Sequence, residues 1–260
     1  MEQGKAQGEK PVSELRVEQL HTLEEFDACV HLQQKTWQYS AGELLPRRVF
    51  FLADKLGGHV LGARDGNTLV GFNLGLPAQR NGMAYIHSQM LAVLPEYRNS
   101  GLGRTMKLRQ REIALEQGIK LIEWTYDPLE IKNSFFNLSR LGAISRRYIP
   151  DFYGSSSSPL QGGLPTDRLY AEWWIDSEHA KRVMAREPMK EKVAATVSVP
   201  AQIYAWKAEG DKHAVQTQLR VREALTRHFV EGLSVIGYER AEDGTGAFLL
   251  GPVPAEFPSY

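Results

Sequence analysis

The pattern of hydrophobic and polar positions predicts alternating strands and helices along most of the chain. A short alternating stretch precedes a helical pattern over 23–37. A second helix is expected from Pro46 to Gly57, since proline favours a helix start and glycine a helix end. The pattern then changes to period two over 59–63 and 68–76. An Asp-Gly-Asn turn joins these two runs and favours a hairpin.

The middle of the chain continues the same alternation. Strands are expected over 83–94, 119–126, 144–153 and 168–175, and helices over 102–117 and 133–141. The serine run over 155–158, followed by two glycines and a proline, predicts a long loop between the last two strands. Loops of that length are often functional.

After Trp174 the pattern restarts. A charged helix, a strand, a long helix over 212–231 and two further strands are expected there. We therefore predict a flexible tail over 1–12, a main domain over 13–176 and a smaller α+β extension over 177–260.

Composition and charge narrow the function classes. Thirty-one basic residues balance thirty-one acidic ones, so the chain lacks the basic excess typical of nucleic-acid-binding proteins. Cys29 is the only cysteine, and no C-x-x-C or H-E-x-x-H pattern occurs, so we expect no disulfide and no metal. Met1 to Pro11 are mostly polar, and no apolar run is long enough to cross a bilayer. We expect a cytoplasmic protein with no nucleic-acid or membrane partner.

The segment from Leu91 to Arg104 carries the pattern that points to chemistry. It leads from an expected strand through a proline turn into an expected helix. Gly101 and Gly103 lack Cβ atoms, so backbone N–H groups can approach a phosphate closely, and the helix start adds a partial charge of about +0.5. A pyrophosphate is therefore predicted to bind at Arg98, Asn99, Ser100, Gly101, Leu102, Gly103 and Arg104.

In this context the loop closely resembles the coenzyme A loop of the GNAT N-acetyltransferase superfamily. The resemblance covers about residues 14–176, whose expected element order is similar to that superfamily's fold. The stretches 124–129, 136–138, 141–143 and 165–169 look like a poorly characterised branch with a C-terminal extension. The resemblance implies an α+β fold, with a mixed, mostly antiparallel sheet flanked by helices. It also implies an N-acyltransferase whose cosubstrate is acetyl-CoA or another acyl-CoA.

The resemblance further implies roles along the long strand. The strand should bulge near Leu91, and the backbones of Leu91 and Val93 should line the acyl-CoA arm, with the Leu91 amide polarising the thioester carbonyl. His87 is the first candidate for general base, because it lies eleven residues before Arg98. Some members of the superfamily carry a glutamate that acts as general base at this position. It could equally be a strand histidine bonded to a neighbour. Glu123, on the adjacent strand, could act instead through water.

The pattern leaves the general acid open. Many members place a tyrosine after the asparagine-led helix, whereas Leu138 occupies that position here. Tyr148 and Tyr153 could replace it or be half-buried aromatics, and the thiolate could also leave unaided. Asn133 and Asn137 could hydrogen-bond the pantetheine amides, although Asn133 could equally cap a helix.

Clues to the acceptor come from Arg146, Arg147 and Arg168 on the two closing strands. They could be solvated strand charges, or Arg146 and Arg168 could hold a substrate carboxylate in bidentate fashion. We therefore expect transfer to a small primary amine, such as an amino acid, by direct attack in a ternary complex. The alternatives are a succinyl-CoA-type N-acyltransferase acting on amino acids and a non-catalytic acyl-CoA sensor. The extension is expected to complete the groove or to support a homodimer.

Overall fold

The computed structural model describes residues 15–40, 42–154, 156 and 161–258. The chain divides into two compact units: residues up to Ala78 with Ile86–Gln117, and Gln79–Tyr85 with residues from Gly118 onward. The tail expected over 1–12 and most of the serine run over 155–158 lie outside the described residues. Within the described part of the chain, no helix combines the length and apolar character needed to cross a membrane.

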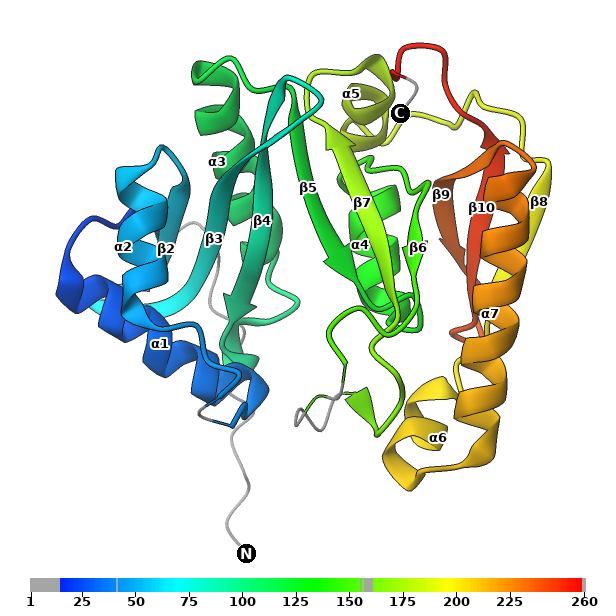
Figure 1. Ribbon diagram of the computed structural model, residues 1–260, viewed down its shortest axis with the longest axis horizontal. Helices are drawn as coiled ribbons and strands as arrows, with labels where there is room; N and C mark the ends of the chain where they lie inside the picture. The colour runs from blue at the N-terminus through cyan, green and yellow to red at the C-terminus, as the bar shows by residue number, and fades with distance from the viewer. Residues whose placement is uncertain (1–14, 41, 155, 157–160, 259–260) are drawn as a thin grey trace, which may run out of the picture. The chain divides into compact units, whose positions relative to one another are not determined.

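The first unit places helices on both sides of antiparallel strands (Figure 1). Its elements are β1 (Arg16–Gln19), α1 (Leu23–Trp37), α2 (Arg47–Lys55), β2 (His59–Asp65), β3 (Thr68–Arg80), β4 (Met83–Val93) and α3 (Leu102–Glu116). The expected hairpin is confirmed, since β2 pairs antiparallel with β3. Gly66 lies in its turn at a φ of 58°, a left-handed conformation that glycine adopts without strain.

Two hydrophobic clusters fix these helices to the strands. Phe26 of α1 and Phe50 of α2 pack with Phe72 of β3 on one face. Leu102 and Met106 of α3 pack on the other face. All five side chains are buried, and burial of each contributes about 1.5–3 kcal/mol relative to exposure. The start of α3 is therefore held firmly on the strands.

The second unit contains the rest of the sheet and the extension. Its elements are β5 (Leu121–Tyr126), α4 (Ile131–Ser139), β6 (Tyr148–Ile149), β7 (Arg168–Trp174), α5 (Glu178–Met184), β8 (Ala195–Val199), α6 (Ile203–Glu209), α7 (Lys212–Val230), β9 (Leu233–Arg240) and β10 (Gly246–Pro252). β5, β7 and β6 are neighbours in that order, and both pairings are antiparallel. A separate three-stranded sheet has the order β8-β10-β9. The expected α+β class with an extra C-terminal sheet is confirmed.

Two details differ from the sequence prediction. The strand expected over 144–153 contracts to Tyr148–Ile149, and only isolated bridges precede it: Ile144 pairs with Glu172 of β7 and Ser145 with Val235 of β9. The sequence analysis also missed α6, whose seven residues end at Gly210 in a left-handed cap. The boundary expected at Asp176 falls between β7 and α5, and independent folding of the segment after it stays a prediction.

Candidate active site

The predicted anion loop lies in the first unit, between β4 and α3. Pro95 to Tyr97 form a single 3-10 turn after β4. Asn99 and Gly101 then adopt left-handed conformations, with φ values of 62° and 95°. The Arg98 Nε donates to the Val93 carbonyl at 3.1 Å, and Ser100 Oγ donates to the Tyr97 carbonyl at 2.7 Å. These contacts hold the loop in shape from within.

The loop offers hydrogen-bond donors to an anion. Gly101 is left-handed and Leu102 begins the helix, a sequence of conformations that turns successive N–H groups toward one point. Among the described residues, the N–H groups of Gly101 and Gly103 donate to no protein acceptor. A Cβ atom built on Gly101 would meet nothing within 4 Å, so the space before the loop is open. The geometry fits a phosphate at the start of α3.

The side-chain alternation of β4 slips by one residue between Ser88 and Leu91. Ser88 contacts Lys107 of α3, and Leu91, three residues later, also packs on the α3 side. Strict alternation would place these two side chains on opposite faces, so an extra residue lies between them, as in a β-bulge. The slip occurs where the sequence analysis expects a bulge.

His87 lies on the other face of β4. Because Ser88 points toward α3, alternation turns His87 toward the face that α1 and α2 cover. The side chain is half-buried. His87 and Leu91 are four residues apart, which would place both side chains on one face of a regular strand, but the slip separates them. The role expected of Leu91 depends on its backbone and is unaffected.

A buried polar cluster lies between β4 and α3. The Lys107 Nζ lies 2.8 Å from Ser88 Oγ and 3.4 Å from Gln110 Oε1. Asn73 Nδ2 donates to the same serine oxygen at 3.2 Å. Burial lowers the pKa of Lys107 well below its ordinary value, so the amine loses its proton at a lower pH than an exposed lysine. The cluster fixes α3, and hence the loop at its start, against β4.

In the second unit, one face of β5 and β7 carries two facing carboxylates. Glu123 and Glu172 are directly opposite in the ladder and fully or almost fully buried. Like charges so placed repel one another, and arginines compensate them. Arg80 binds Glu123 through two nitrogens, at 2.7 and 3.3 Å, and Arg147 also donates to Glu123. Glu123 is thus tied to two guanidinium groups, which leaves it poorly placed to accept a substrate proton.

The arginines expected to recognise the acceptor have different surroundings. Arg146 is nearly buried; its Nε lies 3.0 Å from a Glu172 oxygen, and it also donates to the Pro258 carbonyl at 2.8 Å. Arg168 donates to the neighbouring Asp167 carbonyl at 2.8 Å and has only a long contact, 3.4 Å, to Gln161. Arg168 therefore retains more donors for a ligand than Arg146.

Three arginines of this unit lie over tyrosine rings. The guanidinium carbon is 5.1 Å from the ring centre for Arg80 on Tyr85 and 4.0 Å for Arg147 on Tyr170. For Arg168 on Tyr153 the distance is 5.4 Å. Such contacts contribute about 0.5–1 kcal/mol at exposed sites and leave the edge of the guanidinium able to donate hydrogen bonds.

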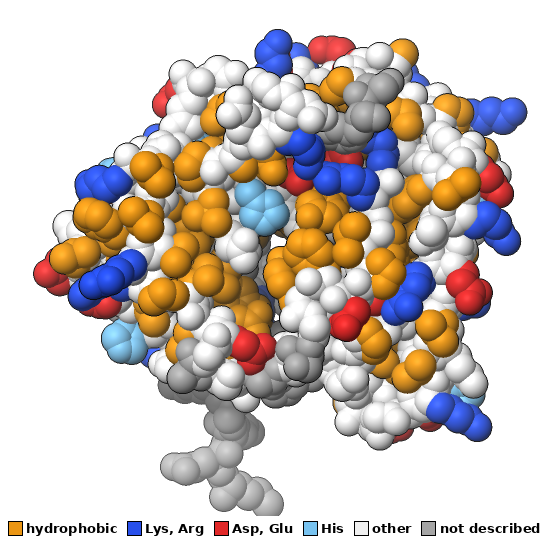
Figure 2. All heavy atoms as spheres, in the orientation of Figure 1, with side chains coloured by type: hydrophobic (Ala, Val, Ile, Leu, Met, Phe, Trp, Pro, Cys, Tyr) orange, Lys and Arg blue, Asp and Glu red, His pale blue; other side chains and the backbone are white. Residues whose placement is uncertain are grey.

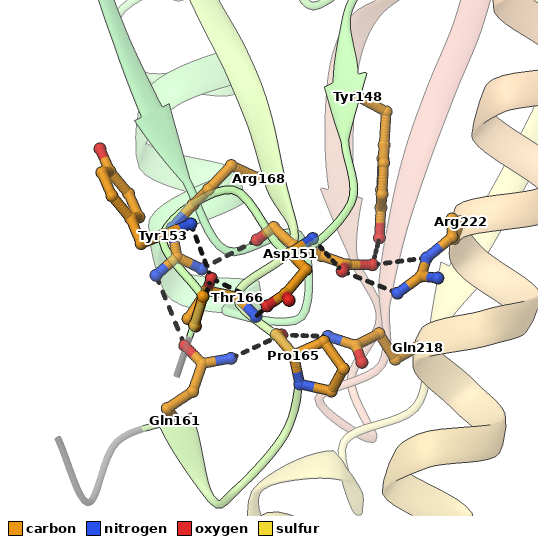
Figure 3. A network of polar contacts seen from close by, with 11 residues as sticks. Tyr148, Asp151, Tyr153, Gln161, Pro165, Thr166, Arg168, Gln218 and Arg222 are labelled. Carbon is orange, nitrogen blue, oxygen red and sulfur yellow. Dashed lines mark hydrogen bonds and ion pairs between the residues drawn. The ribbon is translucent and has the colours of Figure 1, made fainter. Parts of the chain in front are cut away.

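The two tyrosines considered as general acid differ sharply (Figure 3). Tyr148 donates its hydroxyl to the buried Asp167 at 2.5 Å, and Arg222 of α7 binds the same carboxylate through two nitrogens at 2.8 Å. Burial, and then the bond to Asp167, raise the pKa of Tyr148 far above its ordinary value. Tyr153 is 51% exposed, and its hydroxyl lies 3.1 Å from Thr125 Oγ1. Tyr153 is the accessible hydroxyl of the two.

Helix α4 carries Asn133 and Asn137, the two residues predicted to contact pantetheine. Its N-cap is Glu130 and Asn133 lies in its first turn, so Asn133 does not cap the helix because the helix begins earlier than expected. The Asn133 side chain is exposed. Asn137 is buried, and its Nδ2 has no hydrogen-bond partner in the described part of the chain. Leu138 is fully buried and contributes no polar group.

Charge is distributed locally and not as one broad field. On the face drawn in Figure 2, basic and acidic side chains lie close to one another while hydrophobic side chains form larger patches. Equal numbers of basic and acidic residues in the sequence agree with this picture. Recognition of an anion must therefore come from hydrogen-bond donors at a defined site, such as the loop before α3.

Several residues of the site escaped the sequence analysis. Arg80 binds Glu123, and Glu172 faces Glu123 in the ladder. Neither residue belongs to a local sequence motif, and Arg80 lies 43 positions from Glu123. Asp167 and Arg222 are 55 positions apart. Only the strand register and the packing of α7 bring these groups together, so no spacing rule could have found them.

Comparison with known proteins agrees with the loop and the fold. Residues 26–136 match the model of the acetyltransferase (GNAT) family. YncA from Salmonella typhimurium, solved with acetyl-CoA, is 16% identical with a TM-score of 0.51, over 64% of this chain and 96% of that chain. A structure from Desulfovibrio desulfuricans, assigned to the GNAT family, is 14% identical with a TM-score of 0.50, over 62% and 99%. No curated protein matches the sequence. Residues 26–136 therefore resemble the GNAT acetyltransferase family, and the chain continues beyond the matched fold into an extension with its own small sheet.

Proposed function

We propose that this protein transfers an acetyl or other short acyl group from acyl-CoA to the amine of a small molecule that also bears a carboxylate. The observation that carries the donor half is the loop before α3, where a left-handed Gly101 precedes the helix and two N–H groups have no acceptor among the described residues. Those donors suit the pyrophosphate of coenzyme A. Arg98 and Arg104 add positive charge to the same segment.

The proposed chemistry is direct attack by a neutral amine on the thioester carbon. A new C–N bond forms, the C–S bond breaks, and the amine loses a proton. The Leu91 N–H stabilises the negative charge that develops on the carbonyl oxygen, an interaction of a type worth about 3–4 kcal/mol. His87 accepts the amine proton. Tyr153 supplies a proton to the departing thiolate, since it is the more exposed of the two tyrosines considered.

The acceptor half of the proposal depends on Arg168. Its guanidinium keeps donors available and is held over the Tyr153 ring, which limits its freedom before a ligand binds. A planar guanidinium matches a carboxylate in two-pronged fashion. An amino acid, with one amine and one carboxylate, meets both requirements.

The test is thiol release from acetyl-CoA and succinyl-CoA with a panel of amines. We expect acetyl-CoA with amino acids to react faster than with arylalkylamines that lack a carboxylate. Faster reaction of the uncharged amines, or of protein lysines, would refute the acceptor proposal. A preference for succinyl-CoA would identify succinyl-CoA, and not acetyl-CoA, as the acyl donor. Coenzyme A binding without thiol release from any pair would identify an acyl-CoA sensor.

A variant series separates recognition from chemistry. Arg168→Ala should raise the acceptor KM and leave the donor KM unchanged, because a carboxylate clamp binds ground and transition states alike. Arg168→Lys should restore only part of the affinity, since an ammonium keeps the charge but loses the two-pronged geometry. Arg220→Ala is the matched control, because Arg220 is an exposed arginine of α7.

A further inference from the structure

A pocket in the second unit is lined by none of the residues given a role in the proposed reaction. It has a volume of about 160 Å³, is partly open to solvent, and is bordered by the end of α4, by α5 with the segment that follows it, and by β9. Leu138, Val183, Met189 and Ile236 give it apolar walls. An engineered cavity of about 150 Å³ with apolar walls binds benzene, so this space can hold a molecule of that size.

Charged side chains also line the cavity. Three are arginines, Arg140, Arg182 and Arg186, and two are glutamates, Glu187 and Glu191, which leaves one net positive charge. Glu191 is already engaged, since it accepts from Arg182 and from His179 Nδ1 at 3.0 Å. A single negative charge would balance the lining.

Arg186 occupies a backbone position that normally belongs to glycine. The Arg186 N–H donates to the Val183 carbonyl and the Glu187 N–H to the Arg182 carbonyl, both at 3.0 Å, which is a Schellman ending of α5. Arg186 has a φ of 61°, a left-handed conformation that is strained for a residue with a side chain. Within the described residues the Arg186 side chain forms no hydrogen bond or ion pair. Strain at a side chain that lines a cavity points to a role for that side chain.

His179 gives a second, independent sign of a ligand. The side chain is 1% exposed and lines the cavity, and its Nε2 has no hydrogen-bond partner in the described part of the chain. A buried nitrogen without a partner destabilises the folded chain because it has lost its hydrogen bonds to water. It offers a hydrogen bond to a polar group or a water carried in with a ligand.

We propose that this cavity binds a small monocarboxylate with an apolar body about the size of benzoate. Arg186 anchors the carboxylate, with Arg140 beside it. The apolar body packs against Leu138, Ile236 and Met189. Met189 closes the space over β9, where a Cβ atom on Gly237 would come within 2.4 Å of the Met189 methyl group.

The test uses the full chain labelled with ¹³C-methyl methionine. The sequence contains six methionines, and Met189→Leu identifies the signal of the cavity. Titration with benzoate should shift the Met189 methyl signal in a saturable way. Benzyl alcohol, which has a similar shape without the charge, should bind at least tenfold more weakly.

Arg186→Gly is the decisive variant, because glycine relieves the strain at this position and the fold should persist. It should abolish the benzoate shift. Gln38→Gly, the same kind of change at the left-handed end of α1, should leave it intact. Arg168→Ala should also leave it intact, which separates this cavity from the proposed acceptor site. Absence of a benzoate shift, an equal shift after Arg186→Gly, or equal binding of benzyl alcohol would overturn the proposal.

Discussion

The link between Arg222 and Asp167 gives a stability prediction that the structure makes quantitative. Asp167 is fully buried and accepts from Arg222 Nε and Nη2, both at 2.8 Å, as well as from the Tyr148 hydroxyl. Arg222→Leu would leave this carboxylate without a countercharge. Loss of one partner of a buried pair costs about 3–5 kcal/mol, and the 26% exposure of Arg222 lets water reduce this to about 2–3 kcal/mol.

The assay is urea unfolding of single and double variants. Arg220→Leu on the same helix is the control, because the exposed Arg220 donates to a single carbonyl, that of Ser198, and its loss should cost less than about 1 kcal/mol. In the Asp167→Asn background Arg222→Leu should cost about 1–2 kcal/mol less than in the wild type, since no charge is stranded. Equal losses for Arg222→Leu and Arg220→Leu, or full additivity with Asp167→Asn, would refute the reasoning.

Three further predictions concern His87, Lys107 and Cys29. His87→Ala should lower kcat by roughly 10²–10⁴ with coenzyme A affinity preserved, and an unchanged pH–rate profile would assign the proton to another acceptor. Because burial lowers the pKa of Lys107 in the folded chain, the unfolded chain binds more protons than the folded chain between that lowered pKa and the ordinary value of 10.5. The free energy of unfolding should therefore rise with pH as the pH approaches 10.5 from below, by at most about 1.4 kcal/mol per unit, and Lys107→Met should flatten that rise in urea titrations. Burial raises the pKa of Cys29 to about 12, so a thiol reagent should react only after unfolding, and rapid reaction of the folded protein would contradict this.

Features set by local sequence were predictable. The loop at 98–104 combines a strand end, two glycines and a helix start within a few residues, and each has a conformational consequence of its own. The turn at Gly66 follows from its immediate neighbours in the same way. The element order up to β7 therefore followed from the pattern, with the shortened strand at Tyr148 as the main exception.

Features set by register and long-range packing were not predictable. One extra residue between Ser88 and Leu91 reverses which side chains share a face, and a pattern of period two cannot reveal it. The partners of Glu123 depend on where the tip of β3 places Arg80. For the same reason, sequence alone could not distinguish the engaged Arg146 from the more available Arg168.

The central claim is that the loop before α3 holds the pyrophosphate of coenzyme A, and calorimetric titration with coenzyme A tests it most directly. A Cβ atom at Gly103 would lie 3.7 Å from the nearest side chain, that of Leu91, so Gly103→Val should fold normally and crowd only the ligand. Gly118→Ala, at a left-handed glycine outside the loop with open space around it, is the control for general effects of glycine replacement. The account predicts tight binding by the wild type and by Gly118→Ala, and at least tenfold weaker binding by Gly103→Val, a loss of about 1.4 kcal/mol. Equal affinity of Gly103→Val and the wild type would contradict it.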